Sequence, residues 1–331
     1  MAIGVKICSF DFEVAKTTLT NKDLEKFLDT TDEWITKRTG IKKRQILKDN
    51  ETSVDLGISA AKKAIERINF NPLDFDLIIS ASSAPEEIYP STSCVIQDAI
   101  QAKNAACFDL KAACAGLIYS LNVARAFIKS GIYKNILIVA TDSTSKHTDW
   151  SDRSTCVLFS DGAGAIILKA DENDDDILDI DLMADGSCKD YITLTVKGKP
   201  CPIVDKAKEN KKPFIQMKGK EVYRFVMNEM PPRLEKLLKD CNLTPETIDY
   251  FLPHQSNQRM IDALAEKLNI DNSKIISTIE DHGNMSAASV IVALRESIDK
   301  KNLKLPAKIL ISTFGAGMSA GNAIIKLDEN I

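Results

Sequence analysis

The residue best suited to covalent chemistry in this chain is Cys114, in segment 108–117, where a short apolar run gives way to small residues. A helical pattern begins directly behind it, so we expect Cys114 at a helix start. The unpaired N–H groups there carry about half a positive charge, which favours a thiolate over a thiol. The alternative is a cysteine that packs as a small apolar residue between alanines.

Three further residues stand where predicted strands end. His254, one of three histidines, follows an apolar run, and strand ends are where α/β sheets present ligand-binding residues. Asn284 lies in the elbow 281–289, and Ala316 lies in the turn 314–317, where a free N–H can stabilise an oxyanion. Each has a structural alternative, because histidine also serves structure and Gly-Asn or G-x-G sequences are typical of plain turns.

A tryptophan and an arginine near the N-terminus form another candidate pair. Trp34 is one of only two tryptophans and lies four residues before Arg38. An exposed Trp and Arg can hold an adenine ring and a phosphate between them. A core tryptophan beside a surface arginine is the other interpretation.

Composition narrows the class of protein. The 331 residues carry a net charge of −4, which offers no general attraction to nucleic acid or to an anionic membrane. The eight cysteines show no C-x-x-C spacing, so neither a metal site nor a disulfide framework is indicated. The first residues read as a strand rather than a signal peptide, and no apolar run has the length of a membrane span. We therefore expect a cytoplasmic protein.

Helical and strand patterns alternate along the chain, which is typical of an α/β protein. Apolar runs predict strands at 1–7, 75–80, 106–110, 136–140 and 164–168. Amphipathic segments predict helices at 20–28, 55–68, 93–102 and from Cys114 to Gly131. This alternation predicts parallel β-α-β units with both faces of the strands covered.

The second half of the chain repeats the pattern of the first. Segments 72–78 and 245–251 match, as do 136–138 and 309–311, both with an offset of 173 residues. Such matches predict an internal duplication, with halves at 1–172 and 173–331 that meet near the acidic turn 171–176. The offset carries Cys114 to position 287, three residues from Asn284, so pseudo-symmetry predicts that the two loops meet at the centre.

The halves differ by a lysine-rich insertion at 188–220. A loop of this composition is usually a solvated connector. Its alternative function is to dock an acidic partner or a phosphate-bearing ligand.

Five separated motifs together resemble the β-ketoacyl-acyl-carrier-protein synthase III family of the thiolase superfamily, over essentially the whole chain. They are 29–41, the Cys114 segment, 152–155, 254–257 and 283–289. The resemblance implies an α/β, thiolase-like five-layer α-β-α-β-α fold of two duplicated halves, a homodimer, and a Cys-His-Asn triad. Matching positions make Cys114 the nucleophile, with His254 and Asn284 as its partners.

The resemblance also implies the reaction. Cys114 would take the acyl group of an acyl-CoA, while the backbone N–H groups of Cys114 and Ala316 bind the oxyanion. Malonyl-acyl carrier protein would then lose CO2, with its enolate held by His254 and Asn284, and attack the acyl-Cys114. These steps require no metal or redox cofactor. Thr30, Trp34, Arg38 and Arg153 are assigned to the coenzyme A entrance by the same motifs.

The remaining positions concern the acyl group and the carrier protein. Tyr89, Phe314 and Met285 are expected at the acyl pocket, with Tyr89 reaching that of a neighbouring subunit. Arg224 and Arg259 are expected to help the acidic carrier protein dock, an attraction that salt weakens.

Two departures from the family pattern leave the substrate open. Met285 replaces a Thr after Gly-Asn, and the closing loop 317–321 lacks a Trp after its glycines. An acetyl primer therefore does not follow from the resemblance. The alternatives are a specialised acyltransferase or condensing enzyme of a secondary pathway with a non-acetyl primer, and a non-catalytic subunit that only binds acyl chains.

Overall fold

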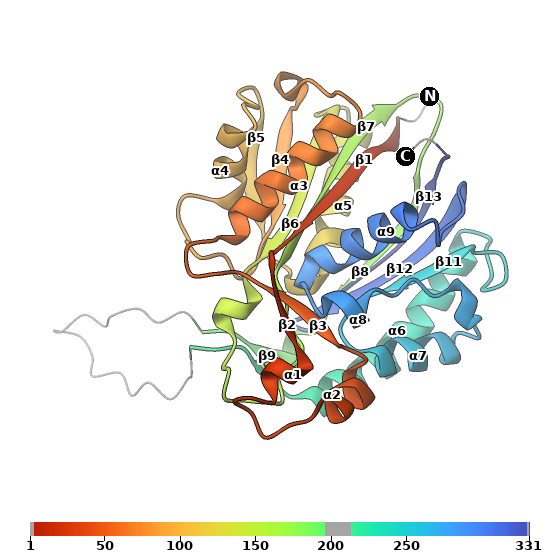
Figure 1. The fold of residues 1–331 in the computed structure, drawn as a ribbon. Coiled ribbons are helices and arrows are strands. Elements are labelled where there is room, and N and C mark those ends of the chain that lie inside the picture. Colours follow the sequence, from red (N-terminus) through yellow and green to blue (C-terminus); the bar gives the residue numbers. More distant parts are fainter. Residues whose placement is uncertain (1–2, 196–212, 330) are drawn as a thin grey trace.

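The computed structural model describes residues 3–195, 213–329 and 331 (Figure 1). Most of the lysines of the 188–220 insertion lie outside the described residues, so its predicted docking function is not addressed by the structure. Within the described ranges no helix combines the length and the apolarity that a membrane crossing needs.

Two sheets form the framework. The first has the order β1-β7-β6-β4-β5, with bounds Gly4–Val14, Gly162–Asp171, Asn135–Asp142, Leu77–Ala81 and Ala106–Leu110. The second has the order β11-β12-β13-β8, with bounds Tyr250–Pro253, Ala307–Gly315, Ser319–Leu327 and Ile177–Ala184. Two small pairs complete the set, β2 (Thr17–Thr20) with β3 (Lys43–Ile46), and β9 (Ile192–Thr193) with β10 (Gln216–Met217).

The prediction of purely parallel units is wrong for four strands. β4 runs parallel to β5 and β6, and β11 runs parallel to β12. However, β7 is antiparallel to both β1 and β6, and β13 is antiparallel to β12 and β8. For β13 the reason is connection length, since only residues 316–318 join it to β12, whereas a parallel crossover needs a dozen or more residues.

The two sheets have corresponding strand orders, which confirms the duplicated thiolase-like fold. Starting from its antiparallel outer strand, the first sheet has the order β1, β7, β6, β4. The second sheet has the corresponding order β8, β13, β12, β11. Ile275 makes a parallel bridge to Phe251 of β11, at the place that β5 takes beside β4. The chain passes from the first sheet to the second between Asp171 and Ile177, and the boundary at 172/173 stays a prediction.

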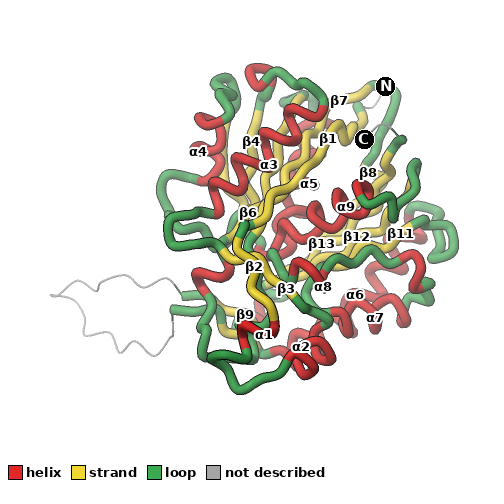
Figure 2. The backbone as a smooth tube through the Cα atoms, viewed as in Figure 1, coloured by secondary structure: helices red, strands yellow, loops and turns green. Residues whose placement is uncertain are grey.

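Helices cover and separate the sheets in five layers (Figure 2). The outer face of the first sheet carries α3 (Ser53–Arg67) and α4 (Thr92–Ala99). Between the sheets lie α5 (Gly116–Lys129) and α9 (Ser289–Asp299), and α6 (Gly219–Asp240) with α7 (Gln258–Lys267) covers the second sheet. Three short helices, α1 (Asn21–Leu24), α2 (Asp32–Thr39) and α8 (Ile279–His282), belong to the lower part of Figure 1.

The central helices position the candidate site. Residues 290–294 of α9 are all buried, because a helix between two sheets has no solvent-facing side. Its close packing needs glycine in the sheet, since a Cβ at Gly164 would lie 2.5 Å from Cβ of Ile291. Both helices follow short 3₁₀ turns that touch one another, η2 (Ala113–Ala115) before α5 and η6 (Ser286–Ala288) before α9. The predicted meeting of the two elbows is confirmed.

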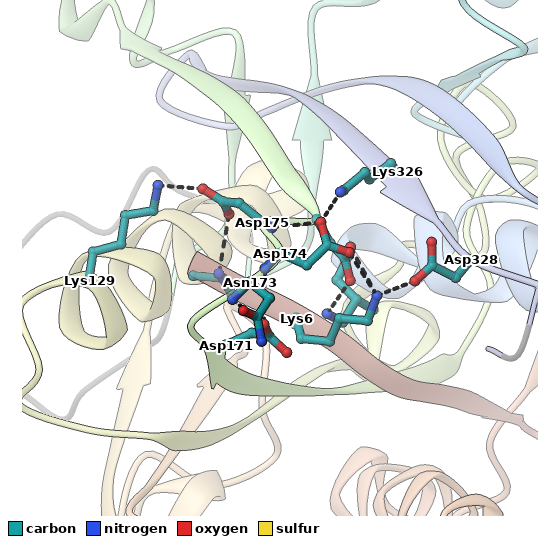
Figure 3. A network of polar contacts seen from close by, with 11 residues as sticks. Lys6, Lys129, Asp171, Asn173, Asp174, Asp175, Lys326 and Asp328 are labelled. Carbon is teal, nitrogen blue, oxygen red and sulfur yellow. Dashed lines mark hydrogen bonds and ion pairs between the residues drawn. The ribbon is translucent and has the colours of Figure 1, made fainter. Parts of the chain in front are cut away.

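The acidic connector between the halves is paired with lysines (Figure 3). Lys6 lies 3.3 Å from the carboxylate of Asp174 and 3.4 Å from that of Asp176, and it also bonds Asp328. Lys326 holds the other oxygen of Asp174. The three carboxylates are close enough to share a metal ion, but the two ammonium groups already supply the positive charge that such an ion would bring. This network ties both ends of the chain to the connector.

Candidate active site

A cavity of about 660 Å³ collects the residues singled out for chemistry. Cys114, His254, Asn284 and Ala316 all line it, together with Phe314. The first four residues lie on four different loops, which follow β5, β11, α8 and β12, respectively. The volume is in the range of small-molecule sites. The structure therefore brings together the predicted nucleophile, its two predicted partners and the predicted oxyanion turn.

Strained backbone and close packing position Cys114. It lies in the 3₁₀ turn η2, one step ahead of α5, and the preceding Ala113 has a left-handed φ of 47°. The N–H of Ala113 donates to Oγ of Ser83 at 2.9 Å. A Cβ at Gly315 would lie 2.6 Å from the backbone N of Cys114, so only glycine allows β12 to approach this closely.

The free thiol is harder to ionise than its place at a helix start predicts. Burial raises the pKa of Cys114 to about 12. The Ser286 hydroxyl, 3.6 Å from Sγ, and the backbone N–H of Cys114 lower that pKa in part, while the nearby Asp142 raises it. Desolvation is thus the largest effect on this thiol and opposes the preference for a thiolate that the helix end was expected to give.

His254 is held as a neutral ring. It directly follows β11, and its backbone N–H donates to the carbonyl of Ser312 at 2.7 Å. The ring packs edge-on against Phe314, with centroids 5.2 Å apart. Burial lowers the pKa of His254 to about 4, so near pH 7 the imidazole carries one donor and one acceptor nitrogen. Nδ1 has no hydrogen-bond partner among the described residues, so no carboxylate of the described chain orients this ring.

Asn284 is fixed through its backbone and its amide oxygen. Its N–H donates to the carbonyl of Leu158 and its carbonyl accepts from Ser160, both at 2.9 Å. Gly283 before it has a φ of 62°, and a Cβ there would lie 3.1 Å from that Leu158 oxygen. The side-chain Oδ1 accepts the N–H of Ser286 at 2.9 Å. The amide NH2 is left as the donor of this side chain toward the cavity.

A hydroxyl ties the oxyanion turn to the cysteine loop. Ser319 Oγ lies 2.9 Å from the carbonyl of Ala316 and 3.3 Å from that of Ala112. These contacts hold the turn after β12 beside the segment that carries Cys114.

Two polar residues of the cavity were given no role by the sequence motifs. Asp142, the last residue of β6, is 2 % exposed, and its Oδ1 accepts the N–H groups of Ser83 and Ala84, each at 2.7 Å. Oγ of Ser286 donates to Sγ of Cys114 at 3.6 Å, and the Ser286 side chain also lowers the pKa of Asp142. One signal for Asp142 was present in the sequence, because a carboxylate that ends an apolar strand is rarely buried without a specific reason.

The residues predicted for coenzyme A form a separate cluster beside the cavity. The guanidinium carbon of Arg153 lies 5.2 Å from the centroid of the Trp34 ring, and that of Arg38 lies 5.6 Å from it. Thr30 precedes the N-cap of α2, and its buried hydroxyl has no partner within the described segments. Asn257, which lines the cavity, donates to the carbonyl of Arg38 at 3.1 Å and so joins α2 to the cavity wall.

The remaining predicted residues fall in different places. Phe314 lines the cavity, but Met285 does not: its side chain packs in the core, where its Sδ would lie 2.4 Å from a Cβ at Gly162. The assignment of Met285 to the acyl pocket is therefore wrong, because the elbow turns this side chain away from Asn284. Tyr89 is 88 % exposed and lies outside the cavity of its own chain.

The two arginines predicted for carrier-protein docking are both exposed. Arg224 is in the second turn of α6, and Arg259 is in the first turn of α7, which packs against α6. Val222 and Met260, their near neighbours in sequence, line the cavity. Both positive charges thus stand on helices that form part of its wall.

Comparison with known proteins agrees with this architecture. Residues 108–186 match the 3-oxoacyl-[acyl-carrier-protein] synthase III family, and residues 238–327 match its C-terminal domain. The β-ketoacyl-[acyl-carrier-protein] synthase III of Clostridium acetobutylicum is 43% identical over 98% of both chains. That of Helicobacter pylori strain 26695 is 40% identical, again over 98% of each chain.

Solved structures show the same fold. The 3-oxoacyl-[acyl-carrier-protein] synthase III of Aquifex aeolicus superposes with a TM-score of 0.90 at 40% identity, over 98% of this chain and 100% of the other. The priming β-ketosynthase of the R1128 polyketide pathway has a TM-score of 0.91 at 29% identity, over 100% and 98% of the chains. This chain belongs to the 3-oxoacyl-[acyl-carrier-protein] synthase III family.

Proposed function

We propose that this chain initiates fatty acid biosynthesis by condensing an acyl-CoA with malonyl-acyl carrier protein, with loss of CO2. The observation that supports this most is the convergence of Cys114, His254 and Asn284 on one cavity, in a chain of this family. The set offers one nucleophile and two neutral hydrogen-bond donors. Those are the groups that acyl transfer and enolate stabilisation require.

In the first half-reaction the sulfur of Cys114 attacks the thioester carbonyl of the acyl-CoA. Negative charge develops on the carbonyl oxygen, and the backbone N–H groups of Cys114 and Ala316 are proposed to bind it. Collapse of this intermediate breaks the bond to coenzyme A and leaves the acyl group on Cys114. The apolar cavity wall at Phe314 then surrounds the acyl chain.

In the second half-reaction malonyl-acyl carrier protein loses CO2 and forms an enolate. The donor nitrogen of neutral His254 and the NH2 group of Asn284 are proposed to hold the enolate oxygen. Asn284 suits this role because its Oδ1 is already engaged by Ser286. The carbanion attacks acyl-Cys114, which forms the new C–C bond and releases the Cys114 thiolate. These steps need no metal or redox cofactor.

The outer surface supports the assignment of substrates. Trp34, Arg38 and Arg153 form a stack suited to an adenine ring and its phosphates, with Thr30 beside them. Arg224 and Arg259 are proposed to attract the acidic carrier protein. We also propose a cytoplasmic homodimer in which Tyr89 reaches the acyl pocket of the partner.

The experiment that tests this function supplies the wild-type chain with malonyl-acyl carrier protein and a panel of acyl-CoAs. CO2 release and the 3-oxoacyl product are both measured. We expect the two in equal amounts. Acyl transfer to another nucleophile without CO2 release would contradict the proposal. A wild type that makes neither product, with a biological activity that Cys114→Ala leaves unchanged, would indicate a non-catalytic acyl-binding subunit.

A specialised pathway with a non-acetyl primer is the second candidate. The observation in its favour is the likeness to the priming β-ketosynthase of R1128 biosynthesis, together with the closing loop 317–321 that lacks a Trp. Mass spectrometry of the protein after incubation with mixed acyl-CoAs shows which acyl group loads. A strong preference for acetyl would exclude the specialised primer.

A further inference from the structure

A buried arginine packs beside the elbow 281–289 and has no part in the mechanism above. Arg44 lies in β3, and 0 % of its surface is exposed. Its guanidinium makes three hydrogen bonds to neutral oxygens, at 2.8 Å to Oδ1 of Asn21, at 2.9 Å to the carbonyl of Val157 and at 3.4 Å to that of Leu19. Nε has no partner within the described ranges. A buried charge that bonds no carboxylate is costly, so its position needs an explanation.

The bond to Val157 leads to the backbone of Asn284. Val157 begins the segment 157–161, which pairs in parallel with Asn284. The Asn284 N–H donates to the carbonyl of Leu158, and the Ser160 N–H donates to the carbonyl of Asn284, both at 2.9 Å. These two bonds fix the backbone from which the Asn284 side chain extends toward the cavity.

β3 holds both ends of that segment. Arg44 binds its first carbonyl, on Val157, through the side chain. Gln45, the next residue of β3, donates its N–H to Oγ of Ser160 at 2.7 Å, and its carbonyl accepts the N–H of Asp161 at 2.8 Å. The bonds of Gln45 use its backbone and do not depend on residue type. The bond to Val157 depends on the Arg44 side chain alone.

Arg44 stands behind the cavity wall rather than in it. Leu158 lines the cavity, whereas Arg44 does not. A Cβ at Gly283, the residue before Asn284, would lie 3.1 Å from the Leu158 carbonyl oxygen and 3.6 Å from Cβ of Arg44. Burial lowers the pKa of Arg44 to about 10, which leaves the guanidinium charged near pH 7. A charged donor bonds a carbonyl more strongly than a neutral donor does.

We propose that Arg44 is a positioning residue for decarboxylation, because its bond to Val157 fixes the segment that holds Asn284 in place for the enolate oxygen. Arg44 acts only through this segment and touches no substrate. Cys114 is held on another loop, after β5, so we expect its acylation to proceed without the arginine. The inference rests on the proposed function for the role of Asn284 in the second half-reaction.

Arg44→Met is the decisive variant, because a methionine side chain fills most of the same space but offers no donor to the Val157 carbonyl. Arg44→Lys keeps a charged donor and should restore part of the function. Arg295→Met is the matched control. Arg295 is 4 % exposed and bonds Asp299 in the last part of α9, at the opposite end of that helix from the elbow.

The first measurement is hydrogen–deuterium exchange at the backbone amides of Ser160 and Asn284, which needs no substrate. We expect these amides to exchange about tenfold faster in Arg44→Met than in wild type, and about threefold faster in Arg44→Lys. They should be unchanged in Arg295→Met. Amides of α3, which lies on the outer face of the first sheet, should exchange alike in all variants and so report any general loss of stability.

The second measurement separates the two half-reactions. In Arg44→Met the kcat for CO2 release from malonyl-acyl carrier protein should fall about 10- to 30-fold with KM unchanged, because one enolate donor is misplaced. Acyl loading of Cys114 should stay within about threefold of wild type. Arg44→Lys should regain part of the lost CO2 release, and Arg295→Met should match wild type in both half-reactions.

Amides of Ser160 and Asn284 that exchange no faster in Arg44→Met than in Arg295→Met overturn the proposal. An equal slowing of both half-reactions in Arg44→Met also overturns it, since that result indicates a purely structural arginine. If Arg44→Met fails to fold, Arg44→Lys decides by the same criteria. If wild type releases no CO2, the proposed function fails, but faster exchange in Arg44→Met would still support the positioning of Asn284.

Discussion

The two elbows at the centre of the molecule have nearly the same backbone but different chemistry. Ala113 and Ser286 are 173 residues apart, and both are left-handed, with φ of 47° and 52°. Each opens a 3₁₀ turn that leads into a central helix. Cys114, the proposed nucleophile, corresponds to Ala287 of the second elbow. The duplication thus gives two elbows of similar backbone, and we propose that single residues assign a different half-reaction to each.

Cys114→Ala makes the first elbow chemically like the second and should have the largest effect. Condensation requires a covalent acyl carrier, so we expect the 3-oxoacyl product to fall by at least about 10³-fold. CO2 release from malonyl-acyl carrier protein should remain, because it depends on the other elbow. Cys241→Ala, in the half-buried cap of α6, is the control and should behave as wild type.

Asn284→Ala alters the second elbow and should have the opposite effect, with CO2 release lost and acyl loading retained. Loss of one enolate donor should slow CO2 release by about 10²- to 10³-fold. Loading of an acyl group onto Cys114, measured by mass spectrometry, should persist. If both half-reactions slow equally in this variant, the division of labour between the elbows is refuted.

Gly315→Ala tests whether the first elbow depends on the close approach of β12. The new Cβ would lie 2.6 Å from the backbone N of Cys114, so the nucleophile must move. A displacement of this kind should slow acylation by about 10²-fold, measured as the burst of coenzyme A release. Gly186→Ala is the matched control, since a Cβ there meets nothing within 4 Å. Unchanged acylation in Gly315→Ala would contradict the geometry proposed for the oxyanion turn.

Arg259→Glu acts outside both elbows and should have the smallest effect. Reversal of a rim charge should raise the KM for malonyl-acyl carrier protein by about tenfold at low salt, and the difference should shrink as salt is added. Loading by acyl-CoA should be unaffected. Lys62→Glu on α3, in the outer layer of the other half, provides the charge-matched control. A KM that moves equally in both variants would indicate a net-charge effect rather than a docking site.

Residue patterns in the sequence predicted most of the helices and parallel strands, and the repeat predicted that the elbows meet. They did not predict the antiparallel β7 and β13, because an apolar strand reads the same in either direction. For β13 the connection sets the direction, because the 316–318 turn is too short for a crossover.

The candidate site, like the fold, could be predicted from the sequence only in part. Motifs identified Cys114, His254 and Asn284, because each residue type carries chemistry of its own. They misplaced Met285, whose direction depends on the turn of the elbow and on the space left by Gly162. They also missed Asp142 and Ser286. Both residues reach the cavity only through contacts between segments that are far apart in the sequence.

The most direct test of the account follows the mass of the Cys114 peptide through one turnover. Incubation of wild type with the preferred acyl-CoA should add one acyl group to Cys114, and malonyl-acyl carrier protein should then remove it with release of one CO2 and one 3-oxoacyl product. An acyl group found on another residue, or one that malonyl-acyl carrier protein fails to discharge, would contradict the assignment of Cys114 as the acyl carrier.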